Sequence, residues 1–183
     1  MTRVVIVGNG MAGARLVQEL RARDQDRRLR ITVFAAERHA SYNRVLLSEL
    51  LAGRTTVDDI YLTPDGWYDD NDVVVHGGVA VTSIDRSRKQ VTAADGRVTD
   101  YDVLVLATGS VPWVPPVDGL VDDGDLIDGA IAFRTVEDCR RIIGVAANAT
   151  GAVVVGGGLL GLEAARGLPG AGSMSRSSTR SAT

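Results

Sequence analysis

Two glycine-rich segments carry the residue types and the spacing that could do chemistry. Gly8, Gly10 and Gly13 follow the apolar run Val4–Val7 and precede a helical pattern that continues to about Arg23. In such a setting the first glycine allows a tight turn, the second lets a pyrophosphate approach the backbone, and the third lets the helix pack against the strand. The first N–H groups of the helix then face the phosphates. The segment therefore predicts a dinucleotide site, with a simple packing turn as the alternative.

A carboxylate stands where such a site needs one. Glu37 comes just after a second expected strand, Ile31–Phe34, and follows Gly13 by 24 residues. At about this spacing an acidic residue accepts hydrogen bonds from a ribose diol. Strand, helix and acid together indicate a βαβ unit that binds a dinucleotide.

The same pattern returns near the end of the chain. Gly156, Gly158 and Gly161 follow the apolar run Ala152–Val155, and a helix is expected from Leu162, with Glu163 in its first turn. An acid at that place favours the helix dipole whatever else it does. Two fingerprints in one chain suggest two dinucleotides and hydride transfer between them.

Composition excludes several other classes of function. The 183 residues carry 20 basic and 23 acidic side chains, so no bulk positive charge favours nucleic acid or an anionic membrane. No apolar run is long enough to span a bilayer. The single cysteine, Cys139, excludes a disulfide, a redox cysteine pair and a four-cysteine iron–sulfur cluster within these residues.

The elements between the two fingerprints are read from periodicity and turn residues. A short helix is expected from Asn43 to Gly53 and a helical turn from Pro64 to Asp70, with Trp67 and Tyr68 anchoring it under the sheet. A small antiparallel meander is expected next, and the buried strand Val103–Leu106 then returns to the main sheet. The meander comprises Val73–Val75, Val79–Ile84, Lys89–Ala93 and Arg97–Thr99.

The second half of the chain is expected to begin with a connection. Residues 111–134 are rich in loop formers, and the acidic stretch Asp122–Asp128 is expected to be a solvated loop. A helix is then predicted from Thr135 to Ala147, with Thr135 as N-cap and Asp138 at N3. The predicted domains are 1–110, a first dinucleotide lobe; 111–134, the connection; and 135–168, the start of a second lobe.

Five stretches identify a family. They are Val7–Gly13, Ile31–Glu37, Tyr42–Ser48, Leu106–Ser110 and Gly156–Glu163. Over about residues 3–168 the chain resembles the two-dinucleotide flavoprotein reductases, and within them the N-terminal part of the large subunit of NAD(P)H-dependent assimilatory nitrite reductase. The resemblance implies an α/β fold: a Rossmann-like FAD-binding lobe with an inserted antiparallel meander, and the start of a Rossmann-like NAD(P) lobe.

The resemblance also implies a role for each site residue. Gly8, Gly10 and Gly13, with Met11 and Ala12 between them, would line the FAD pyrophosphate, and Glu37 would bind the adenosine ribose. The flavin side would involve Asn43 and Arg44, although an exposed arginine on a polar loop is the alternative for Arg44. The remaining FAD contacts would be the backbone of Val79 and the turn formed by Ala107, Thr108 and Gly109. The NADH or NADPH contacts would be Gly156, Gly158, Leu160, Gly161 and Glu163.

Other reactive residue types have a structural interpretation. His39 and His76 lack a second ligand at metal-binding spacing, so they are expected to be surface or loop histidines, and no metal site is predicted. Cys139 is expected to pack in the core.

The last 15 residues, 169–183, have almost no apolar content and are predicted to be disordered. If Ser173–Thr179 were written in GC-rich codons, a shift of one base would read His-Val-Glu-Val-Val-His, a credible second strand for the second lobe. The tail is therefore expected to arise from a frameshift, and the chain to be a fragment.

The function implied is transfer of hydride from NAD(P)H to FAD and of electrons onward to metal centres that reduce nitrite. Sirohaem and iron–sulfur centres would lie in domains outside these residues, and no catalytic acid or base is expected here. A reductase component for ferredoxin, rubredoxin or nitrate reductase is one alternative, and a non-catalytic remnant is another. The expected partners are the nicotinamide dinucleotide and a small nitrite reductase subunit or an electron-acceptor protein. The expected location is cytoplasmic, because no signal peptide is recognisable.

Overall fold

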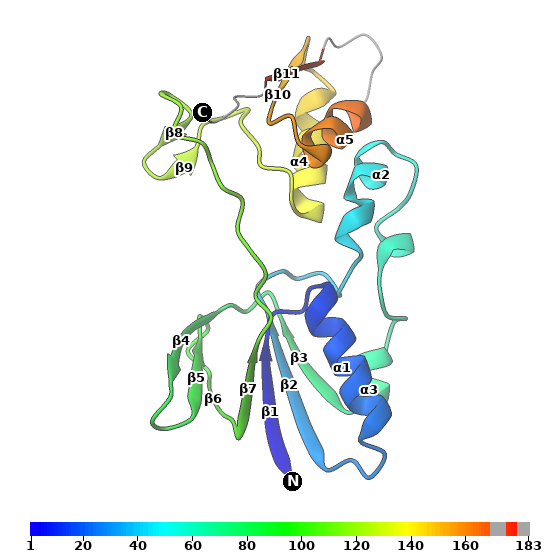
Figure 1. The fold of residues 1–183 in the computed structure, drawn as a ribbon, viewed down its shortest axis with the longest axis vertical. Coiled ribbons are helices and arrows are strands. Elements are labelled where there is room, and N and C mark those ends of the chain that lie inside the picture. Colours follow the sequence, from blue (N-terminus) through cyan, green and yellow to red (C-terminus); the bar gives the residue numbers. More distant parts are fainter. Residues whose placement is uncertain (169–174, 179–183) are drawn as a thin grey trace. The chain divides into compact units, whose positions relative to one another are not determined.

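The computed structural model describes residues 1–168 and 175–178, and these fall into two compact units. The first unit contains Met1–Asn43 and Tyr61–Ser110. The second contains Arg44–Ile60 and the described residues from Val111 onward. Figure 1 shows the elements of both units along the chain. Among the described residues, no helix combines the length and apolar character needed to cross a membrane.

A four-stranded parallel sheet forms the centre of the first unit, with the strand order β3-β2-β1-β7 (Figure 1). Its strands are β1 (Thr2–Val7), β2 (Leu29–Ala35), β3 (Val73–Gly77) and β7 (Val103–Leu106). The chain runs from β1 through β2 to β3 on one side and returns to the opposite side of β1 as β7. In open parallel sheets, ligands bind at the carboxyl ends of the strands where the strand order reverses in this way.

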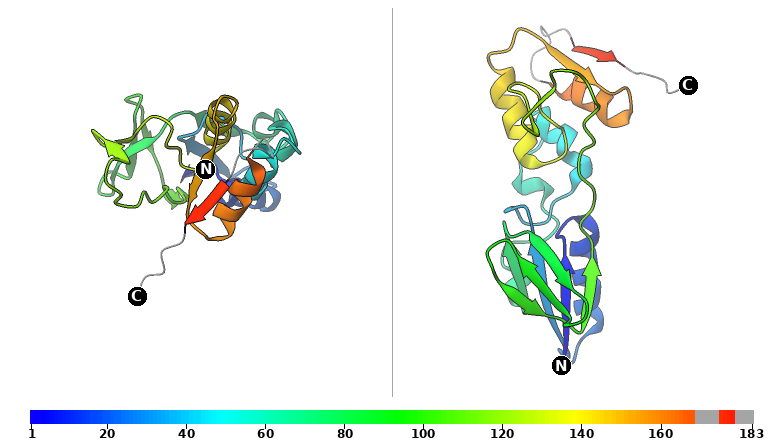
Figure 2. Two further views of the ribbon diagram at one scale, coloured as in Figure 1. Left: turned by 90° about the horizontal axis from the view of Figure 1, so that it is seen from above. Right: turned by 90° about the vertical axis from the view of Figure 1, so that its left-hand side faces the viewer.

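Both faces of this sheet are covered, which explains the continuous apolar run of β1. Val4 and Ile6 face helix α1 (Met11–Arg23), whose Val17 is fully buried, and the short helix α3 (Trp67–Asp70) adds Trp67 and Tyr68 to the same cluster. The anchoring role predicted for these two aromatic residues is confirmed. Figure 2 shows the small sheet β4–β6 on the opposite face from α1.

The small sheet contains β4 (Val81–Asp85), β5 (Gln90–Ala93) and β6 (Val98–Asp100), paired antiparallel. Val91 and Ala93 of this sheet pack against Val5 and Phe34 of the main sheet. The meander is therefore present, but the prediction that Val73–Val75 belongs to it is wrong. That segment is part of β3, which pairs in parallel with β2 because Val73 is buried in the α1-facing core.

The second unit is built mainly from helices. It contains α2 (Leu47–Leu51), α4 (Val136–Ala146) and α5 (Leu159–Gly167), with α2 packed against α4 and α5. Two short 3-10 helices, Arg44–Leu46 and Asp58–Ile60, flank α2. The side chain of Thr135 accepts a hydrogen bond from the Asp138 N–H, and the Asp138 carboxylate accepts one from the Thr135 N–H, so the predicted cap of α4 is confirmed.

Two segments of the second unit differ from the predictions. The acidic stretch is not a plain loop, because β8 (Val121–Asp122) and β9 (Asp125–Leu126) pair as a hairpin. Asp123 and Gly124 form its tip with φ of +51° and +92°, which are angles that aspartate and glycine tolerate in hairpin turns. Helix α5 begins at Leu159, not at Leu162, because Gly158 is its N-cap.

Strand β10 (Ala152–Val155) precedes α5 and pairs in parallel with β11 (Ser175–Ser178). This differs from the disorder predicted for 169–183, because parallel pairing uses backbone N–H and C=O groups, which every residue except proline supplies. The other residues of that tail, 169–174 and 179–183, lie outside the described residues. The frameshift expectation stays a prediction.

Candidate dinucleotide-binding site

The carboxyl ends of the parallel strands in the first unit bring together most of the residues that the sequence singled out. Gly8 follows β1, Glu37 follows β2, and Ala107 follows β7. Val79 follows β3 and precedes β4 by two residues, so it does not start that strand as predicted. The backbone of these exits is hydrogen bonded across strands, which fixes their relative positions.

Gly8 is required by close packing between two strand exits. Its φ is +110°, and its N–H donates to the Phe34 carbonyl at 2.8 Å. A Cβ added there would lie 2.1 Å from the carbonyl oxygen of Ala107, whose own N–H donates to Val7. The turn formed by Ala107, Thr108 and Gly109 therefore passes directly over the first glycine, where only a glycine fits.

The other two glycines have separate roles. A Cβ at Gly13 would lie 2.1 Å from the Gly8 carbonyl oxygen, so this residue lets α1 pack against the turn. At Gly10, in contrast, an added Cβ would meet no described atom within 4 Å. Gly10 thus borders open space at the start of α1, as expected for the position where a pyrophosphate approaches the backbone.

Helix α1 begins at this open space without a side-chain cap from the described residues. Gly10 is the N-cap, and no acid occupies the first turn. Met11 is 40% exposed and Ala12 is also exposed. Since the first N–H groups of a helix have no intrahelical partners, this end can bind an anion.

Glu37 is held by one hydrogen bond to its side chain and one to its backbone. Its carboxylate accepts a hydrogen bond from the Tyr42 hydroxyl at 2.6 Å, and its carbonyl oxygen accepts one from the Gly78 N–H at 3.0 Å. Tyr42 is 4% exposed, whereas Glu37 is half-buried. Because carboxylate oxygens accept more than one hydrogen bond each, this arrangement is compatible with two ribose hydroxyls.

Two further predicted contacts are constrained by the structure. The Val79 N–H already donates to the Ala35 carbonyl at 2.8 Å. The predicted adenine contact would therefore use the carbonyl group of Val79. Arg44 lies in the second unit, while Asn43 ends the first segment of the first unit. The Arg44 guanidinium donates to the carbonyl of Arg134 at 2.9 Å. A joint flavin contact by Asn43 and Arg44 stays a prediction.

Three residues of the first unit that meet at one hydroxyl group were missed as site residues. The Tyr68 hydroxyl donates to the Oδ1 of Asn9, inside the first glycine loop, at 2.9 Å. The same hydroxyl lies 3.0 Å from the Oγ of Ser41, which is 1% exposed. No local motif signals this arrangement, because Tyr68 and Asn9 are far apart in the sequence and tyrosine is common in cores.

The histidines contact aromatic residues or arginine. His76 lies in β3 and is partly exposed, so it is not in a loop, and its ring lies 4.9 Å from that of Phe34. Burial and the nearby Arg97 guanidinium lower the pKa of His76. Because a guanidinium can only donate, the His76 Nδ1 accepts the hydrogen bond from Arg97. His39 contacts the Tyr61 hydroxyl through Nδ1 at 3.3 Å.

The second glycine loop repeats one of these features. A Cβ at Gly161 would lie 2.0 Å from the Gly156 carbonyl oxygen, which matches the packing of Gly13 on Gly8. Gly156 has a φ of +125°, and Gly158 caps α5 without a side-chain partner among the described residues. Glu163 is not in the first turn, since α5 begins at Leu159, and the dipole explanation for it is wrong.

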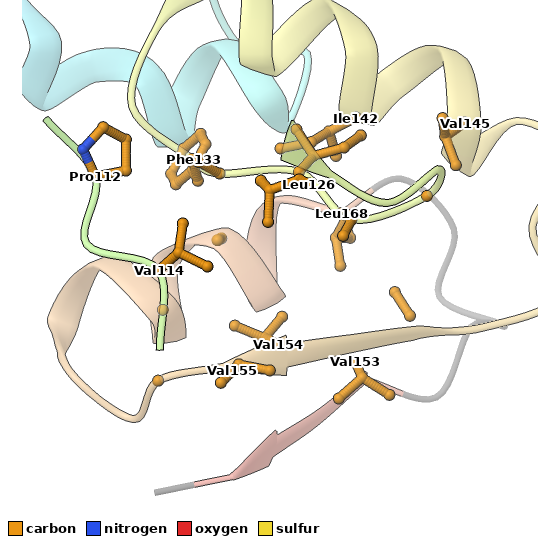
Figure 3. Close-up of a pocket in the computed structure, with 18 of the residues that line it drawn as sticks. Pro112, Val114, Leu126, Phe133, Ile142, Val145, Val153, Val154, Val155 and Leu168 are labelled. Atoms are coloured by element: carbon orange, nitrogen blue, oxygen red, sulfur yellow. The ribbon is translucent and has the colours of Figure 1, made fainter. Parts of the chain in front are cut away.

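A pocket of about 920 Å³ lies within the second unit beside this loop (Figure 3). Its lining is mainly apolar and comes from the connection after Val111, from α4, and from β10. Gly156, Gly158, Leu160 and Gly161 also border it. Labelled lining residues in Figure 3 include Pro112, Val114, Phe133, Ile142 and Val154.

Cys139 is fully buried in α4, and its thiol donates to the Leu47 carbonyl at 3.6 Å. Burial, with a smaller effect of the Asp138 charge, raises its pKa to about 11. Since the thiolate is the nucleophile, we expect a thiol reagent at pH 8 to label the folded chain about 100-fold more slowly than the urea-unfolded chain. The single cysteine makes the readout unambiguous. Labelling of the native chain at the unfolded rate would contradict the packing role.

A strand, a glycine loop and a helix N-terminus occur twice in this chain, and the first is completed by a carboxylate after the adjacent parallel strand. This arrangement is that of a protein with two dinucleotide-binding lobes. The chain belongs to the pyridine nucleotide-disulphide oxidoreductase family, whose pattern matches residues 2–175. The α/β fold with a parallel sheet and antiparallel insertions is confirmed. Enzymes of this family depend on FAD and NAD(P)H, which agrees with the predicted cofactors.

Similar proteins share most of this chain. Nitrite reductase [NAD(P)H] of Bacillus subtilis is 42% identical over 91% of the chain, and the assimilatory nitrate reductase electron transfer subunit of the same organism is 40% identical over 91%. The chain spans 20% and 21% of those two proteins. The crystal structure of NADH:rubredoxin oxidoreductase from Clostridium acetobutylicum superposes with a TM-score of 0.81 and 28% identity, covering 96% of this chain and 44% of that one.

Proposed function

We propose that the first unit binds the adenosine diphosphate half of FAD, and that the second unit begins an NAD(P)H-binding lobe. The observation that carries the proposal is that the first three glycines have different surroundings. At Gly8 and Gly13, backbone atoms occupy the space that a Cβ would need, whereas Gly10 borders open space at the start of a helix without a side-chain cap. Glu37 stands at the end of the neighbouring strand, which suits a ligand with both a pyrophosphate and a ribose.

The residues of the chain would act by binding and orientation. FAD, when bound, supplies the hydride-accepting chemistry. The α1 N-terminus would neutralise the pyrophosphate through backbone N–H groups, and Gly10 would allow the closest approach. Glu37, held by Tyr42, would bind the ribose and set the position of the nucleotide along the sheet edge. No residue of these units needs to transfer a proton.

We infer that the reductase is of the nitrite reductase type, which passes electrons onward to metal centres in other domains. The identity of 42% to a nitrite reductase supports this acceptor over rubredoxin, for which the similar structure is 28% identical. The 40% identity to a nitrate reductase electron transfer subunit supports a second candidate, in which the chain reduces a separate acceptor protein. The nicotinamide chemistry favours a cytoplasmic setting for both candidates.

Reductase activity can be tested on the full chain supplied with FAD. We expect reduction of ferricyanide that requires both FAD and NADH or NADPH and that saturates with the nicotinamide. A second variant, Gly158→Val, fills the open space at the second glycine loop. It should lower the reductase activity while leaving FAD bound, which separates the nicotinamide site from the flavin site. Saturable FAD binding without any reduction of ferricyanide would contradict the reductase proposal and favour a flavin-binding remnant.

The contribution of Glu37 can be measured separately. Glu37→Gln keeps an acceptor for the Tyr42 hydroxyl but removes the charge, and charged hydrogen bonds are roughly twice as strong as neutral ones. We expect FAD affinity to fall about tenfold in a fluorescence titration. Glu49→Gln, which breaks an exposed pair with Arg54 in the second unit, is the control and should leave the affinity unchanged. Equal affinities for the two variants would exclude Glu37 from the ribose site.

A further inference from the structure

The hydroxyl group of Tyr68 lies between two loops at the carboxyl end of the parallel sheet. It donates to the Oδ1 of Asn9 at 2.9 Å, and the Oγ of Ser41 lies 3.0 Å away. A phenol carries one proton, so with that proton on Asn9 the Ser41 hydroxyl donates to the tyrosine oxygen. Both hydrogen-bonding functions of Tyr68 are therefore used, one on each loop.

The position of this hydroxyl is set by packing and does not depend on the two hydrogen bonds alone. The Tyr68 ring packs against the buried cluster beneath α1 and meets the Trp67 ring edge-to-face, with centroids 5.3 Å apart. Ser41, on the opposite side of the hydroxyl, is 1% exposed. The packed side chain thus presents a donor to one loop and an acceptor to the other.

The two segments are those assigned to the two parts of the nucleotide. Asn9 stands between Gly8 and Gly10, in the loop proposed for the pyrophosphate. Ser41 directly precedes Tyr42, whose hydroxyl holds the carboxylate of Glu37 at 2.6 Å. A continuous series of contacts therefore joins the phosphate loop, residues 8–10, to the ribose-binding loop, residues 37–42, which carries the Glu37 carboxylate.

We propose that Tyr68 is a positioning residue that couples the phosphate loop to the ribose-binding loop. The inference rests on the proposed function of the first unit as a site for FAD. With the hydroxyl in place, both loops are held in the arrangement that binds the nucleotide, and binding loses less conformational entropy. Without the Tyr68 hydroxyl, the two loops are no longer joined, and FAD binding must fix the position of each loop separately.

A double-mutant cycle on FAD affinity tests the coupling in the full chain. We expect Tyr68→Phe and Glu37→Gln each to weaken FAD binding about tenfold, and the double variant to bind at least threefold more tightly than the product of the single effects predicts. Tyr101→Phe, on a tyrosine of the core beneath the small sheet, is the matched control and should leave affinity unchanged. Wild-type affinity of Tyr68→Phe, or strictly additive effects, would overturn the proposal.

A second measurement does not depend on FAD. In the ligand-free chain, the protected amides at this loop are Gly8, which donates to the Phe34 carbonyl at 2.8 Å, and Ala14, which donates to the Gly10 carbonyl at 2.9 Å. We expect these two amides to exchange with solvent at least fivefold faster in Tyr68→Phe than in the wild type, while those of β1 are unchanged. Unchanged exchange in the loop, or an equal rise in loop and strand, would overturn the positioning role. Absence of FAD binding by the wild type would instead refute the proposed function. The hydrogen-exchange measurement would then decide the role of Tyr68 by itself.

Discussion

Gly8→Val is expected to destabilise the first unit severely. The new Cβ would lie 2.1 Å from the Ala107 carbonyl oxygen and 2.5 Å from its carbon, and a β-branched residue would have to adopt a φ of +110°. Neither the strand exit nor the turn can move without breaking the hydrogen bonds that join β1, β2 and β7. We expect a loss of about 4 kcal/mol or more in the free energy of unfolding.

Thermal unfolding followed by circular dichroism measures this effect. A loss of that size corresponds to a fall of the melting temperature of about 10 °C or more. Gly10→Val provides the matched control, because the same side chain enters open space on backbone with φ of −76°. Equal melting temperatures for the Gly8→Val variant and the wild type would show that the turn at Ala107 does not pass over Gly8 as described.

Gly10→Val is expected to have the opposite signature: little loss of stability and a large loss of FAD binding. The valine fills the space next to the start of α1, where the pyrophosphate would approach the backbone N–H groups. Because several charge-assisted hydrogen bonds are lost together, we expect affinity to fall about 100-fold or more. A flavin fluorescence titration measures the affinity, and thermal unfolding of the same sample checks that the variant is folded.

The second glycine loop supplies the control for this variant. Gly158 is also a helix N-cap next to open space, but it belongs to the other unit. Gly158→Val should therefore leave FAD affinity near the wild-type value. Tight FAD binding by Gly10→Val would contradict the location of the pyrophosphate, whatever the wild type binds.

The parts of the site that could be predicted from the sequence are those encoded locally. The glycine spacing and the apolar run Val4–Val7 predicted β1, the turn and α1, because the roles of these glycines depend on neighbours a few residues away. Glu37 was predicted for the same reason, since a βαβ unit fixes where its second strand ends. The cap of α4 likewise depends only on Thr135 and Asp138.

What could not be predicted depends on contacts between distant segments. The valines of β3 are as continuous as those of β1, yet their pairing with β2 is decided by burial beneath α1 and not by the adjacent meander. The hydrogen bond between Tyr68 and Asn9 joins two positions that belong to no common sequence motif. Strand β11 has no apolar pattern in its sequence that would indicate its parallel pairing with β10.

Titration of the ligand-free chain with FAD, with FMN in parallel, tests the central claim most directly. FMN lacks the adenosine and the pyrophosphate, so it cannot use the Gly10 loop and Glu37 together. We predict saturable binding of one FAD per chain and at least 100-fold weaker binding of FMN. Equal affinity for the two flavins, or no saturable binding of FAD, would contradict the assignment of the first unit as an FAD-binding lobe.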